Sequence, residues 1–366
     1  MKKYSILLMG AAIAMTSCSS DETADLNSGA EIKITANADA QSRGMSYYHN
    51  IEQFHMTALS PDGTTYLNDV VMDRQSGISS FKPSTPIYWP GTGNLDIYAY
   101  ASQRKAVNGV TINKNTKKIE NFMPAANVED QFDLACVAKT AVRPTDLNTP
   151  VHLLFKHVLS SLFFRGRTYN KNYDVKIKQM KLINFVGKGT YTFENAVPEP
   201  NSSYKVCGSW KLDNSMLTDY NGAERTEDLL IPVSDRNSVT DQHTPGLTGN
   251  GVRESFYVLP QNLTGWSTTN KNGARMAFLV SYTSKENGKS VIEKTDAEGY
   301  AWVYAPFEYT LNPGCSYTFT IDFTNLGGKG INDETLVHTL NITCDIDGMY
   351  GASQSYTHDA NITLEK

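Results

Sequence analysis

The stretch "VHLLFKHVLSSLFFRGR" (residues 151–167) carries the strongest signal for the fold class. Its middle is apolar at successive positions, so neither face is polar. Such a segment is typical of a strand that is buried on both sides, as in the centre of a β-sandwich. Periodicity alone also leaves a helix open. Residues 144–150, which begin and end with proline, are predicted to be a linker that separates two halves of the chain.

Strand-like alternation of apolar and polar residues recurs on both sides of this stretch. Pro61-Asp62-Gly63 is a turn signal between two such runs, because Pro presets φ and Gly accepts a positive φ. Many short strands with turns between them indicate an all-β sandwich or barrel. The expected strands lie at residues 31–38, 54–58, 95–99, 132–138, 174–193 (two strands split by Gly187 and Gly189, with a bulge between Ile177 and Met180), 256–261, 275–283, 315–323, 340–346 and 356–364.

The N-terminus has the organisation of an export signal. A short basic start is followed by an apolar run at residues 6–15, about half of the roughly 20 residues that span a membrane. The run ends in Met15-Thr16-Ser17-Cys18, which resembles the lipobox of bacterial lipoproteins. The resemblance implies that residues 1–17 are removed and that Cys18 carries acyl chains such as palmitate. The alternative is an ordinary signal peptide with an incidental cysteine.

The residues after Cys18 are small and polar. Residues 19–22, Ser-Ser-Asp-Glu, resemble the acidic export tag of surface lipoproteins in certain Gram-negative anaerobes. A solvated linker is the alternative interpretation. We expect residues 18–30 to be a flexible tether to a lipid anchor in the outer membrane, exposed at the cell surface.

Charge and cysteine content narrow the possible partners. The net charge of −5 argues against a nucleic-acid partner. Four cysteines follow Cys18, and in an exported protein they can form two disulfides in three connectivities. Buried free thiols are an equal alternative, because each lies in or beside an expected strand. These cysteines are Cys136, Cys207, Cys315 and Cys344.

Catalytic and metal-binding signatures are weak throughout the sequence. His152 and His157 are five residues apart, so on a strand they face opposite ways. Asp345 and Asp347 precede a glycine, but the acidic residue that ends a calcium loop of the EF type is missing, which favours a turn. The tryptophans could line a glycan site, but core positions are expected for Trp89, Trp210, Trp266 and Trp302. We predict no enzyme, catalytic residue, metal or cofactor; a hydrolase is a distant third hypothesis.

Six motifs follow one another in a fixed order: "EIKITANADAQSRG" (31–44), "FHMTALSPDGTTYLND" (54–69), "STPIYWPGTGNLDIYAYAS" (84–102), "FKHVLSSLFFRGR" (155–167), "IKQMKLINFVGKGTYTF" (177–193) and "LNPGCSYTFTIDF" (311–323). Together they resemble the fimbrillin family, which comprises fimbrial subunits and accessory proteins of Gram-negative anaerobes. The resemblance implies two β-sandwich domains of transthyretin-like topology. We place them at residues 31–149 and 150–366.

The resemblance also implies assembly into a fimbria by exchange of strands. In this family a protease cuts after an arginine and removes the first strand, and the groove accepts a strand from another subunit. Here the expected cleavage site is Arg43, within the polar stretch at residues 41–44; an ordinary surface arginine is the alternative. The released segment, residues 31–38, is predicted to be an edge strand whose apolar face consists of Ile32, Ile34, Ala36 and Ala38.

The C-terminus repeats the alternation of the first strand. We predict that residues 356–364 are the donor segment, with Ile362 and Leu364 as the deep anchors. The alternative is that this strand completes its own domain. The apolar face of the segment consists of Tyr356, His358, Ala360, Ile362 and Leu364.

Two functions from different classes are compatible with these features. The first is a fimbrial subunit or fimbria-associated adhesin whose partners are other fimbrial subunits. The second is a surface lipoprotein that does not polymerise and binds a glycan or a host protein. Residues 324–366 lack the tryptophan-containing strand that closes many fimbrillins, which leaves a shaft, tip or anchor role open.

Overall fold

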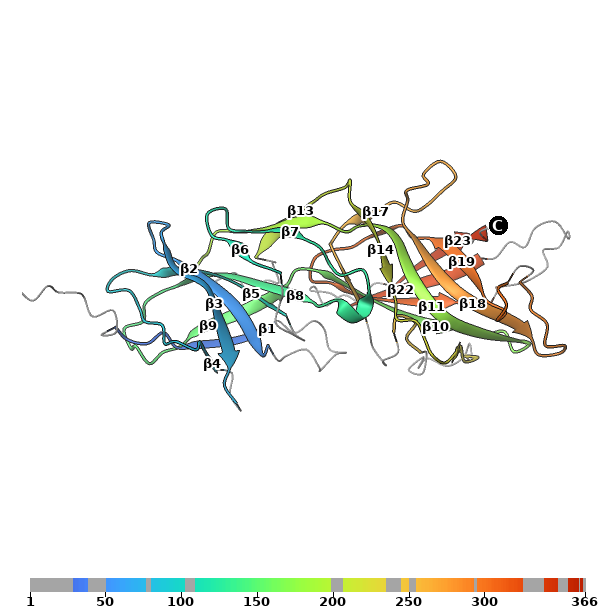
Figure 1. Ribbon diagram of the computed structural model, residues 1–366, viewed down its shortest axis with the longest axis horizontal. Helices are drawn as coiled ribbons and strands as arrows, with labels where there is room; N and C mark the ends of the chain where they lie inside the picture. Colours follow the sequence, from blue (N-terminus) through green and yellow to red (C-terminus); the bar gives the residue numbers. More distant parts are fainter. Residues whose placement is uncertain are drawn as a thin grey trace, which may run out of the picture.

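The computed structural model of the protein describes residues 29–38, 51–76, 80–102, 109–198, 207–234, 245–249, 255–292, 295–324, 339–347, 355–361 and 363–364; side chains are described up to residue 324. The described residues form 24 β-strands and one short 3-10 helix, η1 (Val128–Asp130). The predicted all-β class is therefore confirmed. Figure 1 shows an elongated molecule, with the N-terminal strands at one end and the C-terminal sheets at the other.

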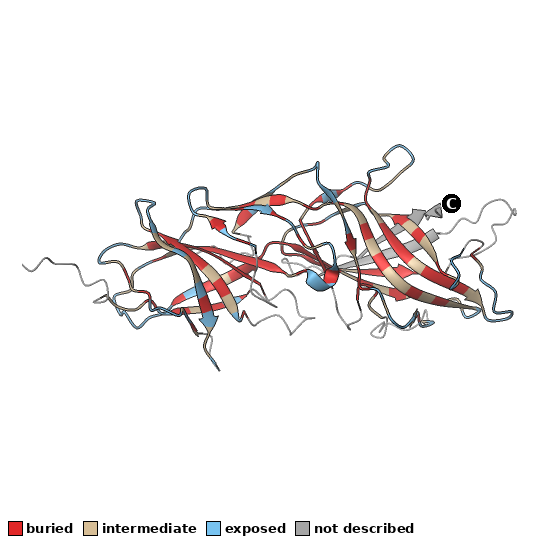
Figure 2. Ribbon diagram, viewed as in Figure 1, coloured by how far each residue is buried: buried red, intermediate tan, exposed pale blue. Residues whose placement is uncertain are grey.

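Seven N-terminal strands close into a barrel rather than leaving two open sheets. Neighbouring strands in the barrel follow the order β1 (Ile34–Ala38), β4 (Ser80–Lys82), β3 (Thr65–Arg74), β2 (Gln53–Leu59), β5 (Leu95–Ser102), β8 (Leu134–Ala141) and β9 (Val151–His157). Buried residues alternate with less buried ones along β1 and the first half of β9, whereas β5 and β8 are buried at most positions (Figure 2). The predicted Pro-Asp-Gly turn joins β2 to β3, and Gly63 there has a φ of 82°.

Two C-terminal sheets share one hydrophobic core, as expected for a sandwich. The first has the order β16 (Phe256–Val258), β10 (Ser160–Arg167), β21 (Ser316–Asp322), β22 (Thr339–Asp347) and β23 (Ser355–Asn361). The second has the order β14 (Leu217–Asn221), β11 (Tyr173–Val186), β18 (Arg275–Ser284), β19 (Ala301–Pro306) and β24 (Thr363–Leu364), and β15 (Leu229–Leu230) also pairs with β11. A separate short pair consists of β17 (Asn262–Leu263) and β20 (Tyr309–Thr310).

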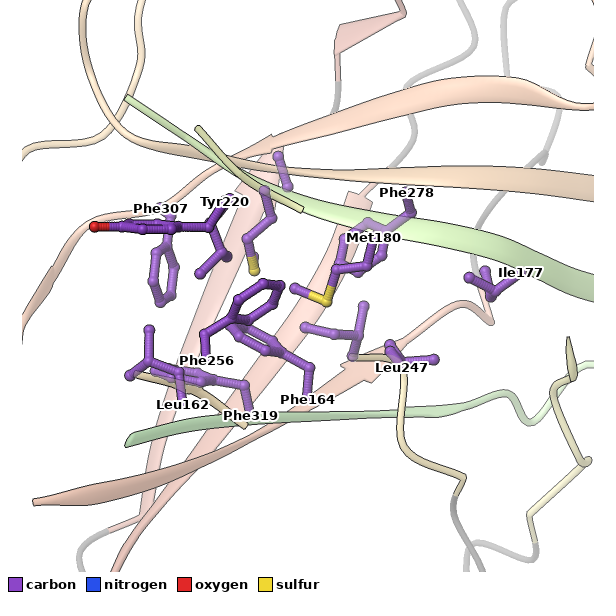
Figure 3. Close-up of a cluster of buried hydrophobic side chains, with 14 of the residues drawn as sticks. Leu162, Phe164, Ile177, Met180, Tyr220, Leu247, Phe256, Phe278, Phe307 and Phe319 are labelled. Carbon is purple, nitrogen blue, oxygen red and sulfur yellow. The ribbon is translucent and has the colours of Figure 1, made fainter. Parts of the chain in front are cut away.

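The shared core of these two sheets is rich in aromatic rings. The Phe164 ring of β10 stacks on Phe319 with centroids 5.0 Å apart, and it meets Phe256 and Phe307 edge-on at 6.2 Å. Met180 and Phe278 reach the same cluster from the second sheet (Figure 3). The predicted bulge in β11 is confirmed, since its register against β18 shifts between Ile177 and Gln179.

A small sheet links the two ends of the molecule. It has the order β13 (Gly208–Leu212), β12 (Gly189–Phe193), β7 (Lys118–Phe122) and β6 (Ile112–Asn113). In this sheet β7, from before the predicted linker, pairs with β12, from after it. A buried cluster under the sheet draws on both halves of the sequence and includes Tyr98, Tyr100, Tyr191 and Tyr257.

The stretch at residues 151–167 forms two strands, where the sequence predicted one. β9 belongs to the barrel and β10 to the first C-terminal sheet, and Val158 and Leu159 lie buried between them. Its apolar residues are buried on both sides because the segment passes from one core into another.

Candidate functional site

The first strand of the barrel is the element on which strand exchange would act. All four residues of its predicted apolar face are buried, with side chains at most 4% exposed: Ile32, Ile34, Ala36 and Ala38. They belong to the same cluster as Phe54, which contacts Phe81 and Phe155 at ring-centroid distances of 5.0 and 5.2 Å. The first strand therefore contributes directly to the core of the barrel.

The prediction that residues 31–38 form an edge strand is wrong for the closed barrel. β1 lies between β4 and β9. It runs parallel to β9 over the five pairs from Ile34–Val151 to Ala38–Phe155. Among the described residues, its antiparallel pairing with β4 comprises Ile34–Phe81 and Thr35–Ser80. Alternation in the sequence identified the buried face, but it carries no information about how many neighbours a strand has.

Residues just before β1 are bound from both sides as well. The Trp89 amide donates to the Ala30 carbonyl at 2.9 Å, and the Ile32 amide donates to the Ile87 carbonyl at 2.8 Å. On the opposite side, the Val151 amide donates to the Lys33 carbonyl at 2.8 Å. Residues 30–38 thus fill one continuous position in the wall of the barrel.

The outward face of this segment contacts the start of β9. The Lys33 ammonium donates to Asn148 Oδ1 at 2.8 Å. Thr35 Oγ1 and His152 Nδ1 are 3.1 Å apart and share a hydrogen bond. Desolvation, followed by repulsion from the Lys139 ammonium, lowers the pKa of His152. Sequence reasoning missed Asn148 and His152 as partners, because nothing local indicates that β9 pairs with β1.

Removal of residues 30–38 would expose apolar side chains and leave backbone groups without hydrogen-bond partners. The side chains of Phe54, Phe81 and Phe155 would lose apolar contacts, and backbone groups of Ile87 and Val151 would lose their partners. A buried polar group without a partner costs about 1–3 kcal/mol. A second strand with alternating apolar residues would satisfy both requirements.

The predicted processing and lipidation sites lie outside the described residues. Arg43 falls between β1, which ends at Ala38, and the next described residue, Ile51. Its position in the chain is therefore between the first two strands of the barrel. Cys18 precedes residue 29, where the description begins.

The predicted donor segment pairs with its own chain in the structure. β23 pairs with β22 along its whole length, from Ser355–Asp345 to Asn361–Thr339. β24 pairs with β19 through Thr363–Tyr304 and Leu364–Val303 in the described part of the chain. Ile362, one of the predicted anchors, lies outside the described residues. This pairing corresponds to the alternative in which the strand completes its own domain.

Comparison with known proteins identifies the family. A family model described as fimbrillin-like matches residues 20–345, which is most of the sequence. The chain belongs to the fimbrillin-like family. A search of curated proteins finds no match.

Solved structures similar to this fimbrillin-like chain share little sequence with it. A candidate cell adhesion protein from Parabacteroides distasonis is 12% identical with a TM-score of 0.48, covering 89% of this chain and 99% of that one. One from Bacteroides uniformis is 12% identical with a TM-score of 0.47, covering 87% and 99%. A fimbrial assembly protein from Parabacteroides distasonis is 10% identical with a TM-score of 0.39, covering 90% and 99%.

The two histidines considered as metal ligands, His152 and His157, differ in burial in this fimbrillin-like protein. His152 is exposed, whereas His157 is buried, with Nδ1 2.5 Å from Asp133 Oδ2. Among the residues that the structure describes, no group of three or more acidic, histidine or cysteine side chains could hold a metal ion. The described cysteines are free thiols: Cys136, Cys207 and Cys315. Burial raises the pKa of Cys207 to about 12.

The expectation that all four tryptophans lie in the core holds for Trp89 alone, because Trp210, Trp266 and Trp302 are only partly buried. Trp89 is buried in the barrel core, and Trp210 Nε1 donates to the Val158 carbonyl at 2.7 Å. Trp302, on β19, lies under the Lys181 ammonium, 4.7 Å from the ring centroid. In the described part of the chain, no helix is long and apolar enough to cross a membrane.

Proposed function

We propose that this protein is a fimbrial subunit or a fimbria-associated adhesin at the cell surface. It would be exported as a lipoprotein and assembled with other fimbrial subunits by protease-triggered exchange of a donor strand. The observation that carries the proposal is the position of β1, which fills a place in the barrel wall immediately before a segment that contains Arg43. One cut in that segment would break the covalent connection between β1 and the rest of the barrel. No catalytic role is proposed.

We also propose that residues 18–30 form a tether and that two domains follow, at residues 31–149 and 150–366. β9 begins at Val151 and lies in the barrel, so the barrel extends past residue 150, the proposed start of the second domain. The proposed transthyretin-like topology comes from the family resemblance.

Lipid anchoring is tested at Cys18. The Cys18→Ala variant should accumulate as an unprocessed precursor or as soluble protein, because the acyl chains that hold it to the outer membrane cannot be added. Metabolic labelling with palmitate and detergent partitioning measure this directly. A variant that is processed and partitions like the wild type would refute the lipoprotein assignment.

Cleavage is tested at Arg43. An arginine-specific protease should convert the purified chain into a ladder of polymers that resists detergent in unboiled gels. The Arg43→Lys variant keeps the positive charge but removes the cleavage site, and should stay monomeric. Assembled fibres in which the chain still begins at Cys18 would exclude removal of the first strand.

The donor role is tested by deleting residues 354–366. Donor behaviour requires a monomer whose melting temperature hardly changes and a polymer that no longer forms. A large loss of monomer stability would mean that the strand belongs to its own domain. That outcome would favour a tip protein or the second candidate, a surface lipoprotein that does not polymerise and binds a glycan or host protein. The observation that favours this second candidate is the pairing of β23 and β24 within their own chain.

A further inference from the structure

The cluster under the linking sheet contains two cysteines that the proposed function does not use. Cys136 lies on β8, where Ala135 and Val137 face the core of the barrel and Cys136 faces away from it, into this cluster. Its side chain is 0% exposed. Cys207 directly precedes β13 and packs, half-buried, against the same cluster. One thiol therefore enters the cluster from the barrel and the other from the linking sheet.

The hydroxyl of Tyr191 lies where the two thiols approach each other. Tyr191 Oη and Cys207 Sγ are 3.4 Å apart and share a hydrogen bond. Burial raises the pKa of Tyr191, and the charges of the Cys207 and Cys136 sulfurs raise it further. Burial is also the main reason why the pKa of Cys136 is raised, and the charge of Cys207 is the next. The two sulfurs are thus close enough to act on the same oxygen and on each other.

A lysine lies beside this pair of cysteines. Lys156 of β9 is opposite Cys136 of β8 in the strand register, so their side chains share a face. Desolvation raises the pKa of Cys207 to about 12, whereas the Tyr191 hydrogen bond and the Lys156 ammonium act in the opposite direction. A thiolate is the nucleophile in disulfide exchange, and a neighbouring ammonium stabilises it. Lys156 therefore favours exchange, while burial makes the thiols unreactive once the cluster has packed.

The backbone register excludes a bond between the other two cysteines. Cys315 belongs to the aromatic core of the C-terminal sandwich, which is a different cluster. Cys344 lies on β22 opposite Phe319, four residues beyond Cys315. Four residues of a strand span about 13 Å, whereas the Cα atoms of a disulfide are about 4.4–6.8 Å apart. Cys136 and Cys207 are the pair that the fold brings together.

We propose that Cys136 and Cys207 form a disulfide while the exported chain folds. The Cys207 thiolate attacks the disulfide of an oxidant and displaces one of its sulfurs. The Cys136 thiolate then attacks Cys207 Sγ and displaces the second sulfur, so the oxidant disulfide becomes two thiols that carry the two protons. Export through an oxidising compartment, which is part of the proposed function, supplies such disulfides.

The bond would tie the barrel to the linking sheet without involving its first strand. Cys136 and Cys207 are 71 positions apart in the sequence. A cross-link over a loop of this length stabilises a protein mainly by restricting the unfolded chain. Because neither cysteine lies on β1, the tie would persist after a cut between β1 and β2.

The pairing is tested by refolding the full chain in a mixture of reduced and oxidised glutathione. Free thiols are then blocked with N-ethylmaleimide in denaturant, and the peptides are mapped by mass spectrometry without reduction. We expect a peptide pair linked through Cys136 and Cys207, with blocked thiols at Cys315 and Cys344. The Cys315→Ser variant is the matched control and should keep the link, whereas Cys136→Ser should leave Cys207 blocked or bound to glutathione.

Three results of the mapping would overturn the proposal. They are blocked thiols at both Cys136 and Cys207, glutathione retained on Cys207 beside a blocked Cys136, and a link from either residue to Cys315 or Cys344. The Cys18→Ala test of lipid anchoring has no bearing on this link, so the two proposals can fail separately.

A denaturant titration tests the bond without relying on peptide mapping. Reduction with dithiothreitol should raise the equilibrium constant for unfolding of the refolded wild type at least tenfold. The double variant Cys136→Ser with Cys207→Ser should respond to dithiothreitol less than twofold. A wild type that responds no more than this variant would show that its native state contains no such bond.

Discussion

Single residues determine how closely the strands of the linking sheet approach one another. Gly208 begins β13 opposite Phe193, and a Cβ atom placed there would lie 2.3 Å from the Thr192 carbonyl oxygen and 2.7 Å from the Tyr191 ring. The Thr192 carbonyl belongs to the backbone of the neighbouring strand, so it cannot move aside as the end of a flexible side chain can. Gly91, in contrast, has no atom within 4 Å of such a Cβ.

We predict that Gly208→Ala lowers the free energy of unfolding by about 1–3 kcal/mol, because the added methyl group forces the pair of strands apart. Gly91→Ala is the matched control and should change it by less than about 0.5 kcal/mol. Chemical denaturation of both variants tests this. Equal effects at the two positions would show that the close approach at Gly208 does not limit stability.

His152 should make the contact between β1 and β9 sensitive to pH. Its pKa is lowered in the folded protein, so the unfolded chain binds a proton more readily than the folded chain does. Stability is therefore lost as pH falls through the ordinary histidine pKa of about 6.5 towards the lowered value. His152→Gln should reduce the loss of stability between pH 7.5 and pH 5, measured by denaturant titration. An unchanged pH dependence would assign the effect to other groups.

At the scale of elements, the sequence predicted strands well and their neighbours poorly. Alternation located β1, β2, β5, β11, β18 and β21, because a strand with one buried face has apolar residues at every second position. The break between β9 and β10 could not be predicted from residues 151–167, because Val158 and Leu159 at the break are apolar and buried like the strands around them. The same limit applies to the site: the apolar face of residues 32–38 was predicted, but its pairing with β9 depends on residues far along the chain.

Two adjacent phenylalanines in β10, Phe163 and Phe164, allow a test of which face of the strand packs against the core. Phe164 is fully buried among aromatic rings, whereas Phe163 is only partly buried on the opposite face. Phe164→Ala should cost about 3–5 kcal/mol in free energy of unfolding, and Phe163→Ala less than half as much. Urea titration of the two variants makes the comparison. Similar losses would mean that the faces of β10 are equally packed.

At the scale of the whole molecule, the linking sheet and its buried cluster join the barrel to the C-terminal sandwich. Tyr191, on β12, is fully buried there, 5.2 Å from Trp210 and 5.2 Å from Phe193 between ring centroids. The cluster also contains Tyr98 of the barrel and Tyr257 of the first C-terminal sheet. The two ends are therefore expected to unfold together.

Truncation of Tyr191 should weaken this coupling. We predict that Tyr191→Ala divides a single calorimetric transition into two, because the cavity removes contacts shared by both ends. Tyr66→Ala, whose side chain is half-buried on the barrel alone, is the control and should keep one transition. One transition in both variants would show that the ends are coupled by other contacts.

The parallel pairing of β1 with β9 also has a consequence for the order of folding. Thr35 and His152 are 117 positions apart in the chain, so a long loop must close before their contact forms. Contacts of such high sequence separation form slowly. During synthesis or export from the N-terminus, β1 emerges first, yet its main partner emerges only after five other barrel strands. β1, which leaves the ribosome before every other described strand, would thus be among the last to dock.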